Sequence, residues 1–469
     1  MRNDATFLAQ AIRKGRLSAV EAMQASLMQA ERQADLGAIV VLDRDLGLKA
    51  ARDMDERMTA PDPDSMPFAG VPSLGKDLGG PFSGLPVAAG SSMLDRAMEQ
   101  AGDSDLALRL RASGLCFFGL TTVPEMGLSL ASEPATGPIC RNPLDPQLTA
   151  GGSSGGAAAA VAAGIVAIAH ATDAGGSIRV PAACCGLVGL KASRGVMPAG
   201  PTFGNHLGGI ASELAVCRSV RDLASLFQVA GGLARGPFAD PRMLAAASGK
   251  LRVGLLTDCG CDFAIDPHRA AAVEAAARAL EAEGHAIVQV PWDRLQKSVA
   301  ASGDVLGDII AVNLANYVDA AGLVPERAEP LTQAFVRRGR AMTGQSLWAS
   351  LDAGVHASRA LWEMFGGVDC LLTPMLSGAP LPLGSFPTDH DDPDLQLARM
   401  AAFAPLASLA NISGFPAITL PFGADATGLP LPVQIMAPMG NDLLLLALAA
   451  RLEAEDRWQH RFPVAGLTP

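Results

Sequence analysis

Two serines lie in glycine-rich segments whose composition is typical of a nucleophilic site. Ser153 lies in the segment GGSSGG, and Ser177 lies in the segment TDAGGSIR. Glycines before a serine permit backbone conformations closed to other residues and let the chain approach a ligand closely. The successive N–H groups of residues 174–177 can then converge on one point and bind the oxygen of a tetrahedral intermediate. The pattern predicts acyl transfer through an activated serine.

A serine hydroxyl needs a base, because it is a weak nucleophile at neutral pH. None of the seven histidines shares a motif with Ser177, and His170 lies in an apolar run that is typical of a core position. The other candidate is Lys76, in the segment GVPSLGKD. A lone lysine is usually a surface charge, but a lysine buried beside two serines loses its preference for the charged form. Lys76 is therefore the alternative candidate, and if it is buried in this way it could accept a proton near neutral pH.

These segments together resemble the amidase signature family. The resemblance rests on Lys76, on GGSSGG and on TDAGGSIRVPAACCGLVGLK, and it extends to TVPE, RNP, NISGFPA and GLPLPVQI. It therefore covers nearly the whole chain and is strongest from residue 70 to 195. The run with Ser193-Arg194-Gly195 is similar to a subgroup of cyclic-dimer hydrolases and aryl- or alkyl-amidases. The alanine that follows Lys191, where a proline is common, departs from the family pattern.

The resemblance implies an α/β fold, with a large mixed central β-sheet covered on both faces by α-helices. It also implies a role for each matching residue. Ser177 would be the nucleophile, Ser153 the serine that relays the proton, usually next to a cis peptide bond, and Lys76 the general base. The expected oxyanion hole is Ala174, Gly175, Gly176 and Ser177, and the expected supporting residues are Ser154, Asp173 and Arg179. The family also implies a homodimer and no metal or organic cofactor.

The resemblance implies a substrate pocket built by variable segments, expected here at 125–130, 200–210 and 300–400. Its candidate wall residues are Met126, Gly127, Phe203, Asn313, Asn316, Tyr317, Phe335 and Trp348. A position in a helix core or on the surface is at least as plausible for each of the larger side chains. The doublet Cys184-Cys185 lies in an apolar stretch without a base, so we expect a buried structural role. Cys259 and Cys261 lack the four-ligand spacing of a zinc site.

The order of elements predicts how these residues are positioned. The first 65 residues are expected to form two helices, and 70–200 to alternate short apolar strands with helices, which indicates an α/β fold. Further strands are expected at 250–256, 285–290, 368–372 and 417–421, and helices at 267–284, across 297–365 and at 442–455. The stretch 377–393 is predicted to be a surface loop. We expect one domain over 1–469: N-terminal helices, a core at 70–200, a variable region at 200–400 and closing elements at 400–469.

Composition restricts the partners and the compartment. Of 469 residues, 49% are hydrophobic and 18% charged, which suits a large buried core. The net charge of −11 and the lack of a basic block argue against nucleic acid and anionic membranes. The apolar run 157–171 is too short to span a bilayer, and Ser18 and Glu21 have the spacing of a helix capping box rather than a signal core. A soluble cytoplasmic protein is expected.

Three functional alternatives stay open at this point. The first is the catalytic subunit of a glutamine-dependent tRNA amidotransferase, which the acidic charge disfavours. The second is a non-catalytic scaffold on the same fold, which the presence of Lys76, Ser153 and Ser177 disfavours. The third is an esterase, because the same acyl-enzyme route cleaves esters. The expected reaction remains hydrolysis of small-molecule carboxamides or of linear or cyclic amides.

Overall fold

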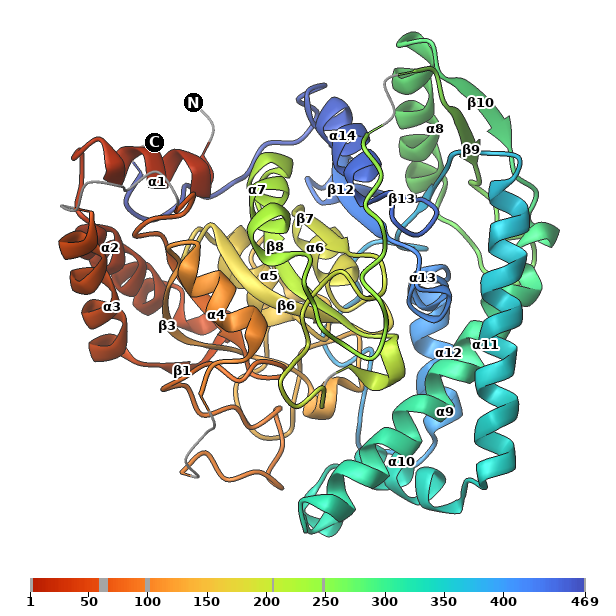
Figure 1. Ribbon diagram of the computed structural model, residues 1–469, viewed down its shortest axis with the longest axis horizontal. Coiled ribbons are helices and arrows are strands. Elements are labelled where there is room, and N and C mark those ends of the chain that lie inside the picture. The colour runs from red at the N-terminus through yellow and green to blue at the C-terminus, as the bar shows by residue number, and fades with distance from the viewer. Residues whose placement is uncertain (1–2, 59–65, 98–101, 205, 247–248, 468–469) are drawn as a thin grey trace.

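One mixed β-sheet runs through the chain (Figure 1). The computed structural model describes residues 3–58, 66–97, 102–204, 206–246 and 249–467. Eleven strands form the sheet, in the spatial order β1 (Ile39–Leu42), β3 (Cys116–Thr121), β2 (Pro72–Lys76), β6 (Ile168–Asp173), β8 (Ser212–Cys217), β7 (Val188–Lys191), β12 (Ala417–Ala424), β13 (Pro430–Met436), β11 (Cys370–Pro374), β9 (Arg252–Leu255) and β10 (Ala286–Gln289). Strand β2 is parallel to β3 and β6, and β9 is parallel to β10 and β11. The pairs that involve β1, β7, β8, β12 and β13 are antiparallel.

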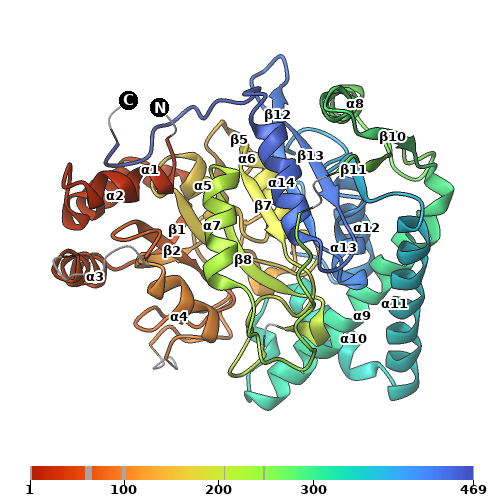
Figure 2. The same ribbon diagram turned by 45° about the horizontal axis from the view of Figure 1, so that its top comes forward.

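Helices cover both faces of the sheet, as the resemblance implied. Strand β7 packs against α6 and α7, and β12 packs against α6 and α14 (Figure 2). The helices are α1 (Ala5–Arg13), α2 (Ala19–Arg32), α3 (Arg44–Arg57), α4 (Asp105–Ala112), α5 (Gly155–Ala162), α6 (Arg179–Cys185), α7 (Val220–Ala230), α8 (Pro267–Ala282), α9 (Gln296–Ala320), α10 (Pro330–Ala341), α11 (Gly344–Phe365), α12 (Pro393–Phe403), α13 (Ala407–Ser413) and α14 (Asp442–Glu453). A short hairpin, β4 (Arg141–Asn142) and β5 (Asp145–Thr149), lies outside the main sheet.

The middle of the sheet is buried on both faces. Every residue of β2, β3, β6, β7 and β11 is buried, so these strands show no alternation between apolar and polar positions. The edge strands β1 and β10 are partly exposed. Residues at the carboxyl ends of the central parallel strands therefore lie in a region shielded from water.

A layer of long helices closes one side of the molecule. Helices α9 to α12 lie together at the right of Figure 1, and α9 packs against α10, α11 and α13. Helix α9 is long and apolar enough to cross a membrane by length and composition, but half of its most apolar window is buried inside the fold. Burial of this kind is also typical of a core helix of a soluble protein.

Most of the elements predicted from the sequence are present, and the N-terminal region differs. The helices predicted at 267–284 and 442–455 are α8 and α14, and the strands predicted at 250–256 and 285–290 are β9 and β10. The expectation of two helices before residue 65 was wrong, because this region forms α1, α2, α3 and the edge strand β1. The turn-rich stretch 61–64 lies outside the described residues. The capping box is present: Ser18 Oγ accepts from the Glu21 N–H at 3.0 Å, and the Ser18 N–H donates to Glu21 Oε2 at 2.6 Å.

Candidate active site

Two parallel strands bring the candidate base and the candidate nucleophile to the same edge of the sheet. Lys76 is the last residue of β2, and Asp173 is the last residue of the neighbouring strand β6. Ser177 lies in the turn between β6 and α6, and Ser153 comes just before α5. Because the carboxyl ends of parallel strands meet at one edge, segments far apart in the sequence converge there.

Lys76 is fully buried and faces hydroxyl groups. Its Nζ donates to Ser153 Oγ at 2.8 Å and to Thr172 Oγ1 at 2.7 Å. Among the described residues, no carboxylate forms a salt bridge with Lys76. Burial lowers the pKa of Lys76 to about 7, although the charges of Glu213 and Asp173 raise it. A substantial fraction of Lys76 is therefore neutral near pH 7, and a neutral amine can accept a proton.

Ser153 is held closely by the backbone around it. The Gly152–Ser153 peptide bond is cis, and Ser132 Oγ donates to the Ser153 carbonyl oxygen at 3.1 Å. A Cβ added at Gly127 would lie 3.4 Å from Ser153 Oγ, so the predicted pocket residue Gly127 faces this hydroxyl directly. Ser153 Oγ thus lies between Lys76 and the segment at 126–127.

Ser154 is bonded to the backbone, and Ser177 is more exposed than Ser153. Ser154 Oγ donates to the Thr172 carbonyl oxygen at 3.2 Å, and the Ser154 N–H donates to the Ser177 carbonyl oxygen at 3.3 Å. Ser177 keeps 8% of its surface exposed, whereas Ser153 keeps 2%. Among the hydrogen bonds of the described residues, none joins Ser153 Oγ to Ser177 Oγ; such contacts often tighten only when substrate binds. Ser177 is thus the more accessible of the two candidate reacting serines.

A buried ion pair fixes the turn that carries Ser177. Arg179 donates from Nε to Asp173 Oδ2 at 2.9 Å and from Nη2 to Asp173 Oδ1 at 3.0 Å. Asp173 Oδ1 also accepts from the Gly176 N–H at 2.7 Å. Burial alone would raise the pKa of Asp173, but Arg179, the Gly176 N–H and the Asn411 amide lower it to about 2. The carboxylate therefore stays charged and keeps the Gly176 N–H turned towards itself.

Two residues from the C-terminal part complete this ion pair. Arg179 donates to Asn411 Oδ1 at 2.7 Å and to Gln434 Oε1 at 2.9 Å, and the Asn411 amide donates to the Asp173 carbonyl oxygen at 2.9 Å. Both residues lie in segments that contributed to the sequence resemblance, NISGFPA and PVQI, but no role was predicted for them. Nothing in the sequence pairs them with Arg179, because the contact depends on the fold.

His170 and Glu213 lie behind Lys76. The Lys76 N–H donates to His170 Nδ1 at 3.2 Å, and His170 Nε2 lies 2.9 Å from Glu213 Oε2. Since Nδ1 accepts, Nε2 carries the proton and donates to the Glu213 carboxylate. Glu213 also lies directly across from Thr172 in the β6–β8 register. The prediction that His170 is a satisfied core residue agrees with these contacts, whereas Glu213 and Thr172 were not predicted.

Among the described residues, no cysteine forms a hydrogen bond with Ser153 or Ser177. Cys184 and Cys185 are buried, and burial raises the pKa of the Cys184 thiol to about 12. Cys259 is buried and Cys261 is exposed. Within the described part of the chain, no group of three or more His, Cys, Asp or Glu side chains is placed to hold a metal ion.

The predicted wall residues lie in different environments. Met126, with a φ of 51°, packs beside a cluster that contains Phe335, which is itself a core residue. Asn316, Tyr317 and Trp348 are exposed, while Phe203 and Asn313 are half-buried. A residue that was not predicted, Leu306 of α9, lies close enough to Gly175 that a Cβ there would meet Leu306 Cδ2 at 2.8 Å.

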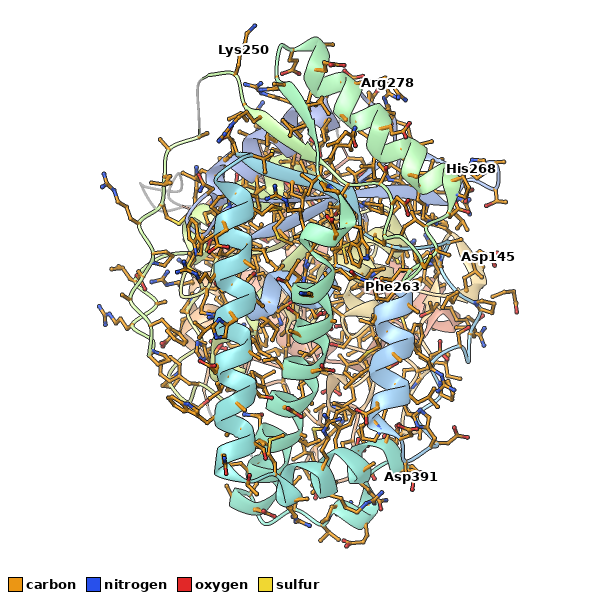
Figure 3. The ribbon with its side chains drawn as sticks, turned by 90° about the vertical axis from the view of Figure 1, so that its right-hand side faces the viewer. Asp145, Lys250, Phe263, His268, Arg278 and Asp391 are labelled. Atoms are coloured by element: carbon orange, nitrogen blue, oxygen red, sulfur yellow. The ribbon has the colours of Figure 1, made fainter. Side chains whose placement is uncertain are left out.

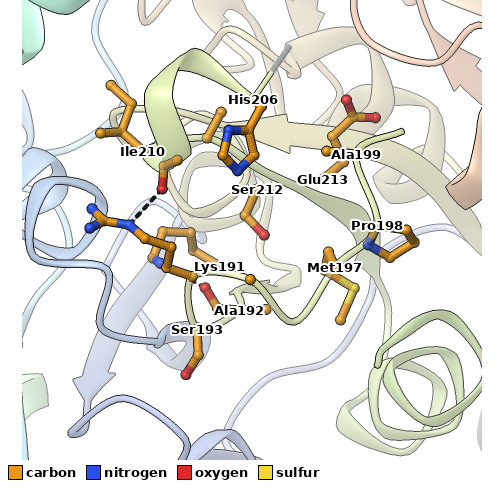
Figure 4. Close-up of a pocket in the computed structure, with 14 residues that line it drawn as sticks. Lys191, Ala192, Ser193, Met197, Pro198, Ala199, His206, Ile210, Ser212 and Glu213 are labelled. Carbon is orange, nitrogen blue, oxygen red and sulfur yellow. Dashed lines mark hydrogen bonds between the residues drawn. The ribbon is translucent and has the colours of Figure 1, made fainter. Parts of the chain in front are cut away.

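A small pocket lies beside this region, beyond strand β8. It is lined by residues that include Lys191, Ser193, His206, Ser212 and Glu213 (Figure 4). Its volume of about 20 Å³ is enough for water rather than for an amide. Its main relation to Lys76 is through Glu213, which contributes to both environments.

The chain is similar to known proteins over nearly its whole length. The amidase family model matches residues 21–446. A 6-aminohexanoate-cyclic-dimer hydrolase from Paenarthrobacter ureafaciens is 34% identical, over 98% of this chain and 96% of that protein. The solved structure of a 6-aminohexanoate cyclic dimer hydrolase complexed with substrate matches with a TM-score of 0.87 and 31% identity, over 98% of each chain. A bacterial aryl acylamidase matches with a TM-score of 0.86 and 26% identity, over 99% of each. The chain therefore belongs to the amidase signature family, and it is an amide hydrolase acting on carbon–nitrogen bonds other than peptide bonds.

Proposed function

We propose that the chain hydrolyses small-molecule amides, linear or cyclic, through an acyl-enzyme on Ser177, with Ser153 as the proton relay and Lys76 as the base. The observation that supports this most is the buried Lys76 Nζ, which contacts Ser153 Oγ at 2.8 Å without forming a salt bridge among the described residues. A lysine in this position has no structural need for its charge and can take a proton near neutral pH.

In the first half of the reaction the proton moves along the relay. Neutral Lys76 accepts the Ser153 proton while Ser153 Oγ accepts the Ser177 proton. Ser177 Oγ bonds to the amide carbonyl carbon, and the carbonyl oxygen becomes an oxyanion. The C–N bond then breaks as the proton returns through Ser153 to the leaving nitrogen, which departs as an amine or as ammonia.

In the second half, water is the nucleophile and Ser177 is the leaving group. The same relay removes a proton from water as its oxygen bonds to the acyl carbon, and Ser177 Oγ leaves with that proton. The carboxylic acid is released and the enzyme returns to its starting state. No metal or organic cofactor enters this sequence of steps.

The oxyanion is assigned to the backbone of residues 174–177. Because the Gly176 N–H already donates to Asp173 Oδ1 at 2.7 Å, the N–H groups of Ala174, Gly175 and Ser177 are the better donors. Each critical donor in such a site is worth about 3–4 kcal/mol of transition-state stabilisation. Asp173 and Arg179 hold the turn, and the Ser154 N–H, just before α5, donates to the Ser177 carbonyl oxygen of that turn.

The substrate is expected to present an aliphatic acyl group. Leu306 lies beside Gly175, and Leu78 Cδ2 lies 2.8 Å from a Cβ placed at Gly127, so an apolar side chain lies near each of the segments that carry or face the two serines. The cyclic-dimer hydrolase relative acts, by its name, on a cyclic amide of an aliphatic amino acid. A cyclic or linear aliphatic amide is therefore the class to test first, with Met126 and Gly127 as contacts beside Ser153.

The deciding experiment is release of amine or ammonia by the purified chain. The panel contains the 6-aminohexanoate cyclic dimer, small aliphatic amides, anilides, glutamine and an ester matched to one amide. We expect amide turnover that Ser177→Ala abolishes and that Lys76→Ala lowers by at least about 100-fold near neutral pH.

Two controls separate the alternatives. Cys261→Ser, which changes an exposed cysteine, is expected to keep full activity. Full activity in both Ser177→Ala and Lys76→Ala would overturn the mechanism. Turnover of the ester alone would favour an esterase, and ammonia release from glutamine only with added partner subunits would favour an amidotransferase. The named relatives are hydrolases and amidases, so they do not favour the last of these.

The setting of this activity is part of the same proposal. We propose a cytoplasmic homodimer that acts on small molecules and binds neither nucleic acid nor membrane. The net charge of −11 supports the second part, since it disfavours contact with a phosphate backbone or an anionic bilayer. The exposed face of α11 offers a candidate surface for the dimer.

A further inference from the structure

The outer face of α11 carries a line of exposed apolar side chains. Trp348, Val355 and Trp362 follow one another at intervals of seven residues, and Leu351 lies between the first two. Their exposed fractions are 74%, 65%, 48% and 41%, in the order Trp348, Val355, Trp362 and Leu351. Seven residues are about two helical turns, so these side chains form one stripe along the helix, here called the α11 stripe. Contiguous exposed apolar side chains mark interaction surfaces.

The rest of the fold holds the α11 stripe outward. The opposite side of α11, which includes Ala357, Leu361 and Met364, is buried, and the helix packs against α9 and α13. The Trp362 ring meets the Phe415 ring edge-on, with centroids 4.8 Å apart. Helix α11 lies at the outer edge of the molecule in Figure 1 and on the face turned to the viewer in Figure 3. The stripe is therefore carried by a helix whose opposite side is packed into the fold.

Charged side chains of both signs flank one edge of the stripe. Asp352 and Arg359 lie about 40–60° round the helix from Val355, on the same side, for about 100° of rotation per residue. Each is exposed and has a partner one turn away in its own helix: Asp352 contacts His356 at 3.5 Å, and Arg359 contacts Glu363 at 3.1 Å. Such exposed pairs contribute little to stability.

We propose that two copies of the chain pair through the α11 stripe, antiparallel about a two-fold axis at Val355. Trp348 of one copy then packs near Trp362 of the partner subunit, and Val355 meets its own equivalent. Asp352 lies three residues before the axis and Arg359 four residues after it. In the antiparallel pair, Asp352 and the partner's Arg359 therefore differ in height by one residue's rise, about 1.5 Å. The two-fold axis keeps both charged edges on one side and repeats the ion pair reciprocally.

A second copy fits this surface better than other occupants. When a second copy is placed antiparallel, the acidic Asp352 of each copy lies near the basic Arg359 of the other, so the surface is complementary to itself. An anionic membrane surface would favour a basic edge instead. The inference rests on the proposed homodimer and names its interface; it does not depend on the proposed chemistry at Ser177.

The test measures the mass of the full chain by sedimentation over a range of concentrations. We expect a dimer, and we expect Val355→Glu to raise its dissociation constant by at least about tenfold, because two like charges would meet at the axis. Asp352→Arg and Arg359→Asp are each expected to weaken the dimer, and the double exchange to restore it. Leu108→Glu on α4, where Leu108 is 55% exposed, is the matched control and should leave the dimer unchanged.

The outcomes distinguish the interface from the rest of the proposal. A dimer that Val355→Glu leaves intact would overturn the interface while keeping the homodimer. A monomeric wild-type chain would overturn both. Single charge reversals that weaken the dimer without rescue by the double exchange would overturn the antiparallel pairing. Amide turnover by Val355→Glu, measured separately, tests the chemistry, and we expect it to persist.

Discussion

At the scale of single residues, the environment of Lys76 is governed by two opposing effects. Burial disfavours its charge, while Glu213 and Asp173 favour it, and burial is the larger effect. Asp173 is paired with Arg179, whereas among the described residues Glu213 contacts only the His170 ring and, at 3.4 Å, the Gly80 N–H. Within the described part of the chain, removing the Glu213 charge therefore breaks no ion pair with an arginine, whereas removing the Asp173 charge would break the pair with Arg179. The carboxylate of Asp77, which follows Lys76 in the chain, is paired with Arg96.

The first prediction concerns the pH dependence of hydrolysis. Only neutral Lys76 can accept a proton, so kcat/KM is expected to rise with pH through about 7 and then level off. Glu213→Gln removes a negative charge that raises the pKa of Lys76. The rising limb should therefore move to lower pH, and the variant should keep relatively more activity on the acid side. The measurement is kcat/KM against pH for both proteins.

A remote carboxylate provides the control for this measurement. Asp369, which pairs with Arg252 near the far end of the sheet, can be changed to Asn without altering charge near Lys76. Its pH profile should match that of the wild type. A limb that stays in place in Glu213→Gln, or that moves to higher pH, would show that Glu213 does not tune the base.

At the scale of elements, the first turn of α5 packs very closely against neighbouring backbone because it consists of glycine and alanine. A Cβ at Gly156 would lie 2.4 Å from the Thr122 nitrogen and 2.5 Å from the Ala38 carbonyl oxygen, and both are backbone atoms that cannot turn aside. This close approach places Ser153, just before α5, beside β2 and β6.

The second prediction follows from this contact. Gly156→Ala should lower the free energy of unfolding by about 1–3 kcal/mol, because the added methyl group has no space. Gly303→Ala in α9 is the matched control, since a Cβ there has nothing within 4 Å. It should be neutral or stabilise the protein by up to about 1 kcal/mol through helix propensity. Chemical denaturation of the two variants measures the difference, and equal midpoints would contradict the argument.

The strength of the local sequence pattern determined which elements could be predicted. Strands and helices with a strong local pattern, such as β9 and α8, were predicted close to their observed bounds. Strand β13 was not predicted as a strand, because Pro430 and Pro432 are typical of turns and edges. In the sheet, Pro432 lies opposite Pro421 of β12, so two residues that lack a backbone N–H face each other across the pair. Such an arrangement depends on a partner strand and leaves no local signal.

The residues of the candidate site also fall into those that a local motif identifies and those that only the fold brings together. Lys76, Ser153 and Ser177 could be named from the sequence because each lies in a glycine-rich or strand-end motif that resembles the family. Asn411, Gln434 and Glu213 could not be paired with Arg179 or His170, because those contacts join segments separated by 43 to 255 residues. The walls of the pocket were the least predictable, since exposure of Trp348 and burial of Phe335 depend on helix orientation.

At the scale of the whole molecule, the order of strands joins the two ends of the chain. The N-terminal strands β1, β3 and β2 continue through β6, β8 and β7 into the C-terminal strands β12, β13 and β11. One hydrophobic cluster includes Phe117 of β3 and Leu372 of β11, which lie towards opposite ends of this sheet. The ion pair of Asp173 and Arg179 is completed by Asn411 and Gln434, so the turn that carries Ser177 also needs both parts.

The third prediction is that these parts unfold as one unit in spite of the length of the chain. Domains are separated by segments that few contacts cross, but here the sheet and its core cross every candidate boundary. Hydrogen exchange at increasing urea concentration should therefore remove protection from β3 and from β11 at the same midpoint. The edge strand β10, whose residues are mostly exposed, is the internal control and should exchange at lower urea through local opening. If β3 and β11 lost protection at clearly different midpoints, the chain would consist of two cooperative units, and the turn at Ser177 would lose Asn411 and Gln434 before its own strands opened.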